Sequence, residues 1–122
     1  MDGFSDTPGA FNIASDHEDY FSVKEFNHYF NNIPTAINMA SFSAHNSIRF
    51  QVLGNDFMRE ATNDEIVLME QMVIDDMEEG AYGLSTGLEY DPGIYSASDE
   101  VVRLTSTIAD FDGRYKSHIR SE

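Results

Sequence analysis

The sequence predicts an α/β fold with about three parallel strands, and two observations carry this prediction. Strand-like apolar segments alternate with amphipathic helical segments in the order strand, helix, strand, helix, strand. The later helical segments each end within one or two residues of the next strand, which is typical of βαβ units. The expected strands cover 35–44, 81–88 and 114–120.

The first helix is expected over residues 22–33, after an irregular arm formed by residues 1–21. Apolar side chains recur at helical spacing in SVKEFNHYFNNI, with Ser22 as the N-cap and Glu25 three residues later. Pro34 ends this helix. The next segment, TAINMASFSA, reads as a largely buried strand. Residues 45–60 are then expected to be irregular.

The clearest helix is expected between residues 62 and 80. Thr62 and Glu65 form a capping-box pattern, and Gly80 stands where a helix-ending glycine is common. The predicted apolar face consists of Ile66, Met69, Val73 and Met77, widened by Leu68 and Met72. After the second strand, a Pro-Gly turn lies in a loop at 89–98, and a last helix at 98–113 is capped by Ser98 or Ser96.

The bulk composition is that of one acidic globular domain. The chain has 122 residues, 41% of them hydrophobic, whereas a closed (β/α)8 barrel typically needs about 250. Its 22 acidic and 7 basic residues give a net charge of −15, which disfavours binding to nucleic acid or to an anionic membrane. No cysteine is present, so disulfide scaffolds and thiol catalysis are excluded. We expect a cytoplasmic protein, because no signal peptide or membrane span is recognisable.

Candidate functional residues follow the predicted strands, since parallel sheets gather such residues at the carboxyl ends of their strands. His118 is a possible zinc ligand or a structural histidine. His45 is about equally suited to loop packing and to a substrate role. Tyr90 is either a loop aromatic or a phenol that hydrogen-bonds a substrate. Nucleotide-binding and serine-hydrolase motifs are absent from the sequence.

Two blocks of sequence resemble the N-acyl-D-amino-acid deacylases (D-aminoacylases) of the amidohydrolase superfamily. They are GLSTGLEYDPG and YKSHIRSE. The upstream NMASFSAHNSIR resembles a strand of that family that ends in a loop with the motif G-H-x-x-x-R. The resemblance runs from about Phe21 to Glu122. It implies that residues 22–122 are part of a TIM (β/α)8 barrel whose zinc ion activates a water that attacks the amide of an N-acyl-D-amino acid.

The same resemblance implies a role for each candidate residue. His118 would be a zinc ligand, Tyr90 and His45 would bind the substrate or shape its pocket, and Arg120 and Glu122 would support the site as neighbouring partners. The family's H-x-H motif and bridging cysteine are absent, and its later histidine and catalytic aspartate would lie beyond the chain. We therefore expect an internal fragment with no complete catalytic set, inactive by itself, which needs the remaining half of the barrel. The alternative is a non-catalytic acidic half-barrel module that assembles with a partner chain.

Overall fold

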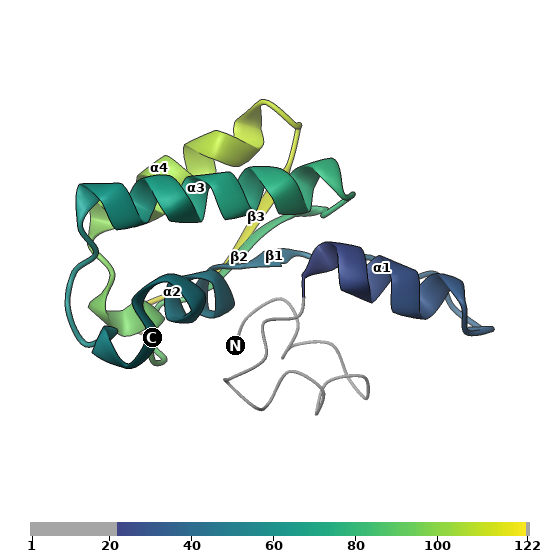
Figure 1. Ribbon diagram of the computed structural model, residues 1–122, viewed down its shortest axis with the longest axis horizontal. Coiled ribbons are helices and arrows are strands. Elements are labelled where there is room, and N and C mark those ends of the chain that lie inside the picture. The colour runs from purple at the N-terminus through teal and green to yellow at the C-terminus, as the bar shows by residue number, and fades with distance from the viewer. Residues whose placement is uncertain (1–21, 122) are drawn as a thin grey trace.

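A three-stranded parallel sheet is the centre of the fold in the computed structural model, which describes residues 22–121 (Figure 1). The predicted arm at 1–21 lies outside the described residues. The elements are, in chain order, α1 (Val23–Asn31), β1 (Ser43–Ala44), α2 (His45–Leu53), the 3-10 turn η2 (Gly54–Asp56), α3 (Asn63–Glu78), β2 (Gly83–Gly87), the 3-10 turn η3 (Gly93–Tyr95), α4 (Ser98–Ala109) and β3 (Arg114–His118).

The strands follow one another in the order β1-β2-β3, and both pairings are parallel. Leu84 of β2 lies opposite Ser43 on one side and Tyr115 on the other. At the carboxyl end, Gly87 lies opposite His118. The predicted parallel α/β arrangement is thereby confirmed, and the carboxyl ends of the three strands lie at the same end of the sheet.

Both predicted capping boxes are present. The Ser22 hydroxyl accepts a hydrogen bond from the Glu25 amide, and the Glu25 carboxylate accepts one from the Ser22 amide in return. Thr62 and Glu65 form the same reciprocal pair at the start of α3. Such caps satisfy amides that have no partner inside the helix, so the sequence fixes these two starting points locally.

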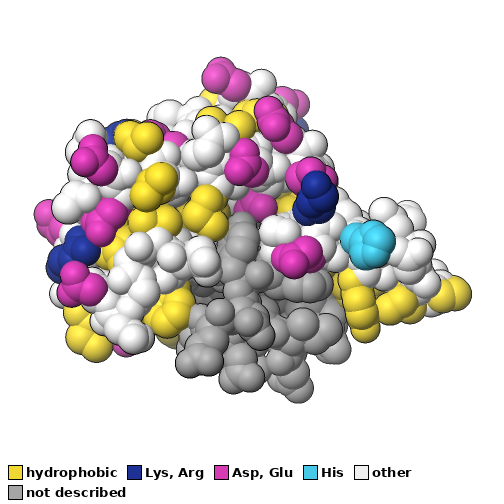
Figure 2. All heavy atoms as spheres, viewed as in Figure 1, with side chains coloured by type: hydrophobic (Ala, Val, Ile, Leu, Met, Phe, Trp, Pro, Cys, Tyr) yellow, Lys and Arg dark blue, Asp and Glu magenta, His cyan; other side chains and the backbone are white. Residues whose placement is uncertain are grey.

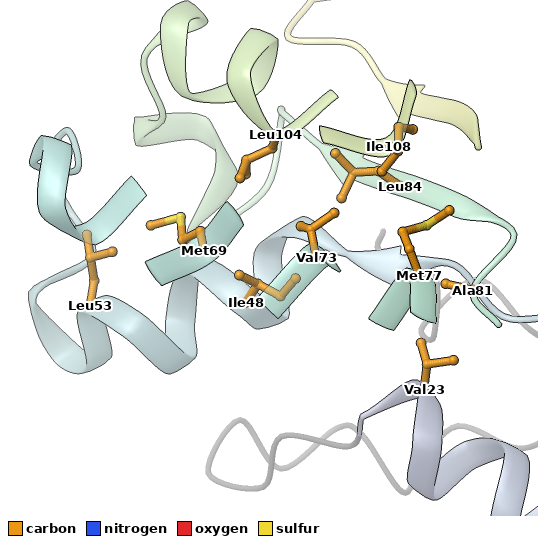
Figure 3. Packing of buried hydrophobic residues seen from close by; sticks show 10 residues of the cluster. All are labelled: Val23, Ile48, Leu53, Met69, Val73, Met77, Ala81, Leu84, Leu104 and Ile108. Atoms are coloured by element: carbon orange, nitrogen blue, oxygen red, sulfur yellow. The ribbon is translucent and has the colours of Figure 1, made fainter. Parts of the chain in front are cut away.

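The hydrophobic core lies where α3 and α4 pack side by side against the sheet (Figures 1 and 3). Met69, Val73 and Leu84 are fully buried at its centre. The predicted face of α3 is confirmed for Ile66, Met69, Val73 and Met77, but Leu68 is 58% exposed and does not widen it. The buried cluster consists of Val23, Ile48, Leu53, Met69, Val73, Met77, Ala81, Leu84, Leu104 and Ile108.

Two segments differ from the sequence-based expectation. Only Ser43–Ala44 of the predicted strand at 35–44 pairs in the sheet, and Ile37 is 70% exposed. Residues 45–60, expected to be irregular, contain α2 and η2. The buried face of α2 carries polar His45, Asn46 and Arg49 beside Ile48 and Leu53. A pattern based on apolar spacing does not detect a helix whose buried face is largely polar.

The start of α4 also differs from the prediction. Its N-cap is Ala97, and no side chain caps it. Ser98 is already helical, whereas the buried Ser96 hydroxyl donates to the carbonyl of Gly93 inside the preceding loop. Asp99 and Glu100 occupy the first turn, where negative charge interacts favourably with the helix dipole.

The surface is predominantly acidic, as the net charge requires. Figure 2 shows acidic side chains spread over the region that Figure 1 assigns to α3 and α4, with few basic ones between them. Among the basic residues of the chain, Arg103 of α4 forms a bidentate pair with Glu70 of α3. Between residues 22 and 121, no helix is long and apolar enough to cross a membrane.

Candidate functional site at the carboxyl edge of the sheet

Tyr90 and His118 are brought together at the carboxyl edge of the sheet. His118 is the last residue of β3, and Tyr90 follows β2 by three residues. The Tyr90 hydroxyl lies 3.3 Å from His118 Nε2, and the two rings meet edge to face with centroids 4.9 Å apart. The pairing of Gly87 with His118 and the bond from the Leu88 amide to the His118 carbonyl (3.0 Å) hold the two strand ends in register.

The other ring nitrogen of His118 faces oxygen atoms. Nδ1 lies 3.4 Å from a carboxylate oxygen of Glu89 and 3.3 Å from the carbonyl of Ile119. Histidines that ligate metals commonly donate their second N–H to such a carboxylate or carbonyl, which orients the ring. His118 therefore suits one position in a metal site. Across residues 22–121, however, no three His, Cys, Asp or Glu side chains gather closely enough to hold a metal ion.

A buried polar network joins α2 to α4. Glu100 of α4 accepts from the Nε2 of His45 (2.7 Å) and from the guanidinium of Arg49 (2.5 Å), and all three side chains are fully buried. Arg49 also donates to the carbonyls of Pro92 (3.0 Å) and Arg59. Because Arg49 and Glu100 carry opposite charges and share a short bond, neither charge is left uncompensated in the interior.

The charge state of Glu100 follows from its partners. Burial by itself raises the pKa of this carboxyl, since it disfavours the charged form. The hydrogen bond from His45 and the positive charge of Arg49 act in the opposite direction and outweigh burial, so the pKa lies below its usual value. Glu100 is therefore a carboxylate at neutral pH, which is the form that accepts from both neighbours.

Arg120 also contacts the loop that carries Tyr90. Its guanidinium donates to the carbonyls of Ile94 (2.7 Å) and Ser96 (2.6 Å). Arg120 thus binds the backbone of this loop, and its expected supporting role at the site stays a prediction. The predicted partner Glu122 lies outside the described residues, and its role stays a prediction.

His45 does not join Tyr90 and His118 in the structure. Its ring is fully buried against Glu100, and its Nδ1 has no hydrogen-bond partner among residues 22–121. This geometry offers the ring no direct route to a ligand, and the expected role in shaping the pocket stays a prediction. The sequence reasoning missed Glu100 and gave Arg49 no role. One signal was available, because His45 and Arg49 are four residues apart and so share a face of any helix formed there.

Comparison with known proteins identifies relatives of the chain. D-aminoacylase from Alcaligenes xylosoxydans xylosoxydans is 33% identical over 89 residues, which cover 73% of this chain and 18% of that protein. N-acyl-D-glutamate deacylase of the same organism is 33% identical over 86 residues, which cover 70% of this chain and 17% of that protein. The chain therefore spans less than a fifth of the length of these two relatives. No family model matches the sequence.

Solved structures agree with the sequence relatives. The crystal structure of a D-aminoacylase, described as defining a novel subset of amidohydrolases, matches with a TM-score of 0.81 at 26% identity, over 98% of this chain and 26% of that one. N-acyl-D-glutamate deacylase from Bordetella bronchiseptica, solved with zinc and a phosphonate inhibitor, matches with a TM-score of 0.78 at 30% identity, over 83% of this chain and 21% of that one.

The α/β fold and these likenesses place the chain among relatives of the amidohydrolases. More narrowly, it is homologous to a segment of the N-acyl-D-amino-acid deacylases, which confirms the resemblance seen in the sequence.

Proposed function

We propose that this chain is a segment of a zinc-dependent N-acyl-D-amino-acid deacylase, and that its three strands form part of a (β/α)8 barrel. The pairing of Tyr90 with His118 at the carboxyl ends of neighbouring parallel strands carries the proposal. Enzymes with such barrels place their chemistry at that end of the strands. The relatives named D-aminoacylase and N-acyl-D-glutamate deacylase suggest N-acyl-D-amino acids as substrates.

In this proposal His118 is one of several metal ligands, and the remaining ligands come from outside this chain. A bound zinc ion would supply an activated water and polarise the amide carbonyl. The carboxylate of Glu89 and the carbonyl of Ile119 near Nδ1 keep the ring of His118 in one orientation. The Tyr90 side chain is partly exposed and its hydroxyl lies next to this ring, so in this proposal the hydroxyl hydrogen-bonds the substrate beside the metal.

The chain alone should be inactive, because one histidine does not hold a catalytic zinc ion, which needs about three protein ligands. A chimera therefore provides the test. The matching segment of the Alcaligenes D-aminoacylase is replaced by the corresponding residues of this chain, and zinc content and hydrolysis of an N-acetyl-D-amino acid are measured. The matched variant is the same chimera with His118→Ala.

The expected result is a folded chimera that holds zinc and hydrolyses the D substrate in preference to the L form. His118→Ala should lower both zinc content and hydrolysis while leaving the circular dichroism spectrum unchanged. A folded chimera whose zinc content does not respond to His118→Ala would refute the assignment of His118 as a ligand.

A second candidate, a non-catalytic half-barrel that assembles with a partner chain, is favoured by the edges of the sheet. Within the described residues, β1 and β3 each pair on one side only. Three residues of β3, Arg114, Tyr115 and Lys116, are exposed. Unpaired strand edges tend to bind further strands. Co-purification of a second chain that carries parallel strands and lacks hydrolase activity would favour this candidate over the deacylase.

A further inference from the structure

The loop between β2 and α4 carries Tyr90, and its own hydrogen bonds are short-range. The Ile94 amide donates to the Tyr90 carbonyl (2.9 Å), and the Ser96 amide donates to the Gly93 carbonyl (3.1 Å). These bonds define the local turn, and the Leu88 amide also ties the start of the loop to the His118 carbonyl (3.0 Å). The rest of the loop, from Tyr90 onward, is held by side chains from outside it.

The first set of outside contacts comes from α2, directly after β1. Asn46 donates to the carbonyl of Gly87 (3.2 Å), and Arg49 donates to the carbonyl of Pro92 (3.0 Å). The loop approaches α2 so closely that a Cβ atom at Gly93 would lie 2.2 Å from Asn46 Oδ1. Arg49 is fully buried, and Glu100 compensates its charge.

The second set comes from the residues after β3. Arg120 reaches back over the loop and donates to the carbonyls of Ile94 and Ser96. The loop is thus bonded on one side by a helix that follows β1 and on the other by an arginine that follows β3. Hydrogen bonds from charged groups are stronger than those between neutral groups, so these contacts outweigh the neutral bonds inside the loop.

We infer that Arg120 and the Arg49–Glu100 pair are positioning residues that hold the 88–96 loop between the two outer strands and thereby keep Tyr90 against His118. Both arginines act through backbone carbonyls of the loop, since Arg49 donates to Pro92 and Arg120 donates to Ile94 and Ser96. The value of this arrangement for catalysis rests on the proposed deacylase function, whereas the placement of Tyr90 is a property of the chain itself.

The test uses the 122-residue chain labelled for NMR and two readouts. The first is hydrogen exchange at the Ile94 and Ser96 amides. The second is the chemical shift of the His118 ring protons, which lie near the edge-to-face Tyr90 ring. Tyr90→Leu supplies the shift expected without that ring. Arg103→Ala is the matched control, because the guanidinium of Arg103 is also bidentate but bonds Glu70 and Asn63 of α3.

Arg120→Ala removes exposed side-chain atoms and should leave the core folded. We expect exchange at Ile94 and Ser96 to accelerate about tenfold or more, the equivalent of one charged hydrogen bond. The His118 shift should move at least half of the way to the Tyr90→Leu value, and Arg120→Lys should restore only part of it, because lysine lacks the two-pronged geometry. Exchange at Met69 and Val73 should stay within about twofold of wild type.

The paired variant Arg49→Met with Glu100→Gln tests the other side without leaving a buried charge unpaired. This variant should accelerate hydrogen exchange at the same two loop amides, those of Ile94 and Ser96. The inference would be overturned if the His118 ring protons of Arg120→Ala kept their wild-type chemical shifts. It would also be overturned if Arg103→Ala changed these shifts as much as Arg120→Ala does. If the shifts move as expected but the chimera described above hydrolyses nothing, the deacylase proposal fails and the positioning role stands.

Discussion

The Tyr90 hydroxyl lies 3.3 Å from the Nε2 of His118, across the boundary between β2 and β3. Both side chains are partly open to solvent, with Tyr90 43% exposed. A hydrogen bond in such a position contributes little to folding, because water can replace either partner. Because stability does not require this pair, we explain it by the proposed function at the carboxyl ends of the strands.

Tyr90→Phe tests this explanation directly. The change removes the hydroxyl and keeps the ring that contacts His118, so the free energy of unfolding should change by less than about 0.5 kcal/mol. Urea denaturation followed by circular dichroism measures it. A loss of about 2 kcal/mol or more would make the hydrogen bond a structural one and weaken the case for a site.

Zinc binding by the isolated chain supplies a second prediction. Since residues 22–121 contain no group of three suitable ligands, zinc should dialyse away to well below one ion per chain. His118→Ala should not change the amount that remains. Near-stoichiometric zinc, measured by atomic emission after dialysis against a metal-free buffer, would contradict the view that the remaining ligands lie elsewhere.

The sequence predicts the helices that carry local signals. Capping boxes at Ser22 and Thr62 mark the starts of α1 and α3 because the partners that satisfy the first amides are three residues apart. Gly80 marks the end of α3, and it adopts a positive φ of 97°. These features depend on neighbours in the chain, so no tertiary information is needed to find them.

Prediction from the sequence fails for residues whose burial depends on a partner far away in the chain. Arg49 and Glu100 are 51 residues apart, and each is typical of a solvated helix face when taken alone. Their burial requires the other charge, which only the folded chain brings near. The Tyr90–His118 pair could be predicted from the sequence, because residues at the carboxyl ends of neighbouring parallel strands are expected to lie close together.

Leu84 provides a test of the core. It is fully buried in β2 and belongs to the same core cluster as residues of α3 and α4, so Leu84→Ala removes packed atoms and leaves a cavity. We expect the free energy of unfolding to fall by about 3 kcal/mol. Val102→Ala on the surface of α4 is the matched control, because Val102 is 60% exposed and should change stability by about 0.5 kcal/mol or less. Equal losses in the two variants would place the core elsewhere.

The capping carboxylate at the start of α3 leads to a prediction about stability at low pH. The hydrogen bond from the Arg59 side chain, followed by that from the Thr62 amide, lowers the pKa of Glu65 to about 2 from a usual value of 4.5. Because the folded state holds this proton less tightly than the unfolded state, the stabilisation is fully present above pH 4.5. It is lost as the pH falls from 4.5 to about 2.

Glu65→Gln should therefore destabilise the chain by roughly 1 kcal/mol at pH 7, a modest value because the Arg59–Glu65 pair is partly exposed. The difference from wild type should shrink as the pH falls and approach zero near pH 2. Urea titrations at pH 7, 4.5, 3 and 2 measure it. Glu78→Gln removes the same charge from an exposed position near the end of α3 and serves as the control. If the difference between Glu65→Gln and wild type stayed constant across this range, the bond from Arg59 would not be the source of the shifted pKa.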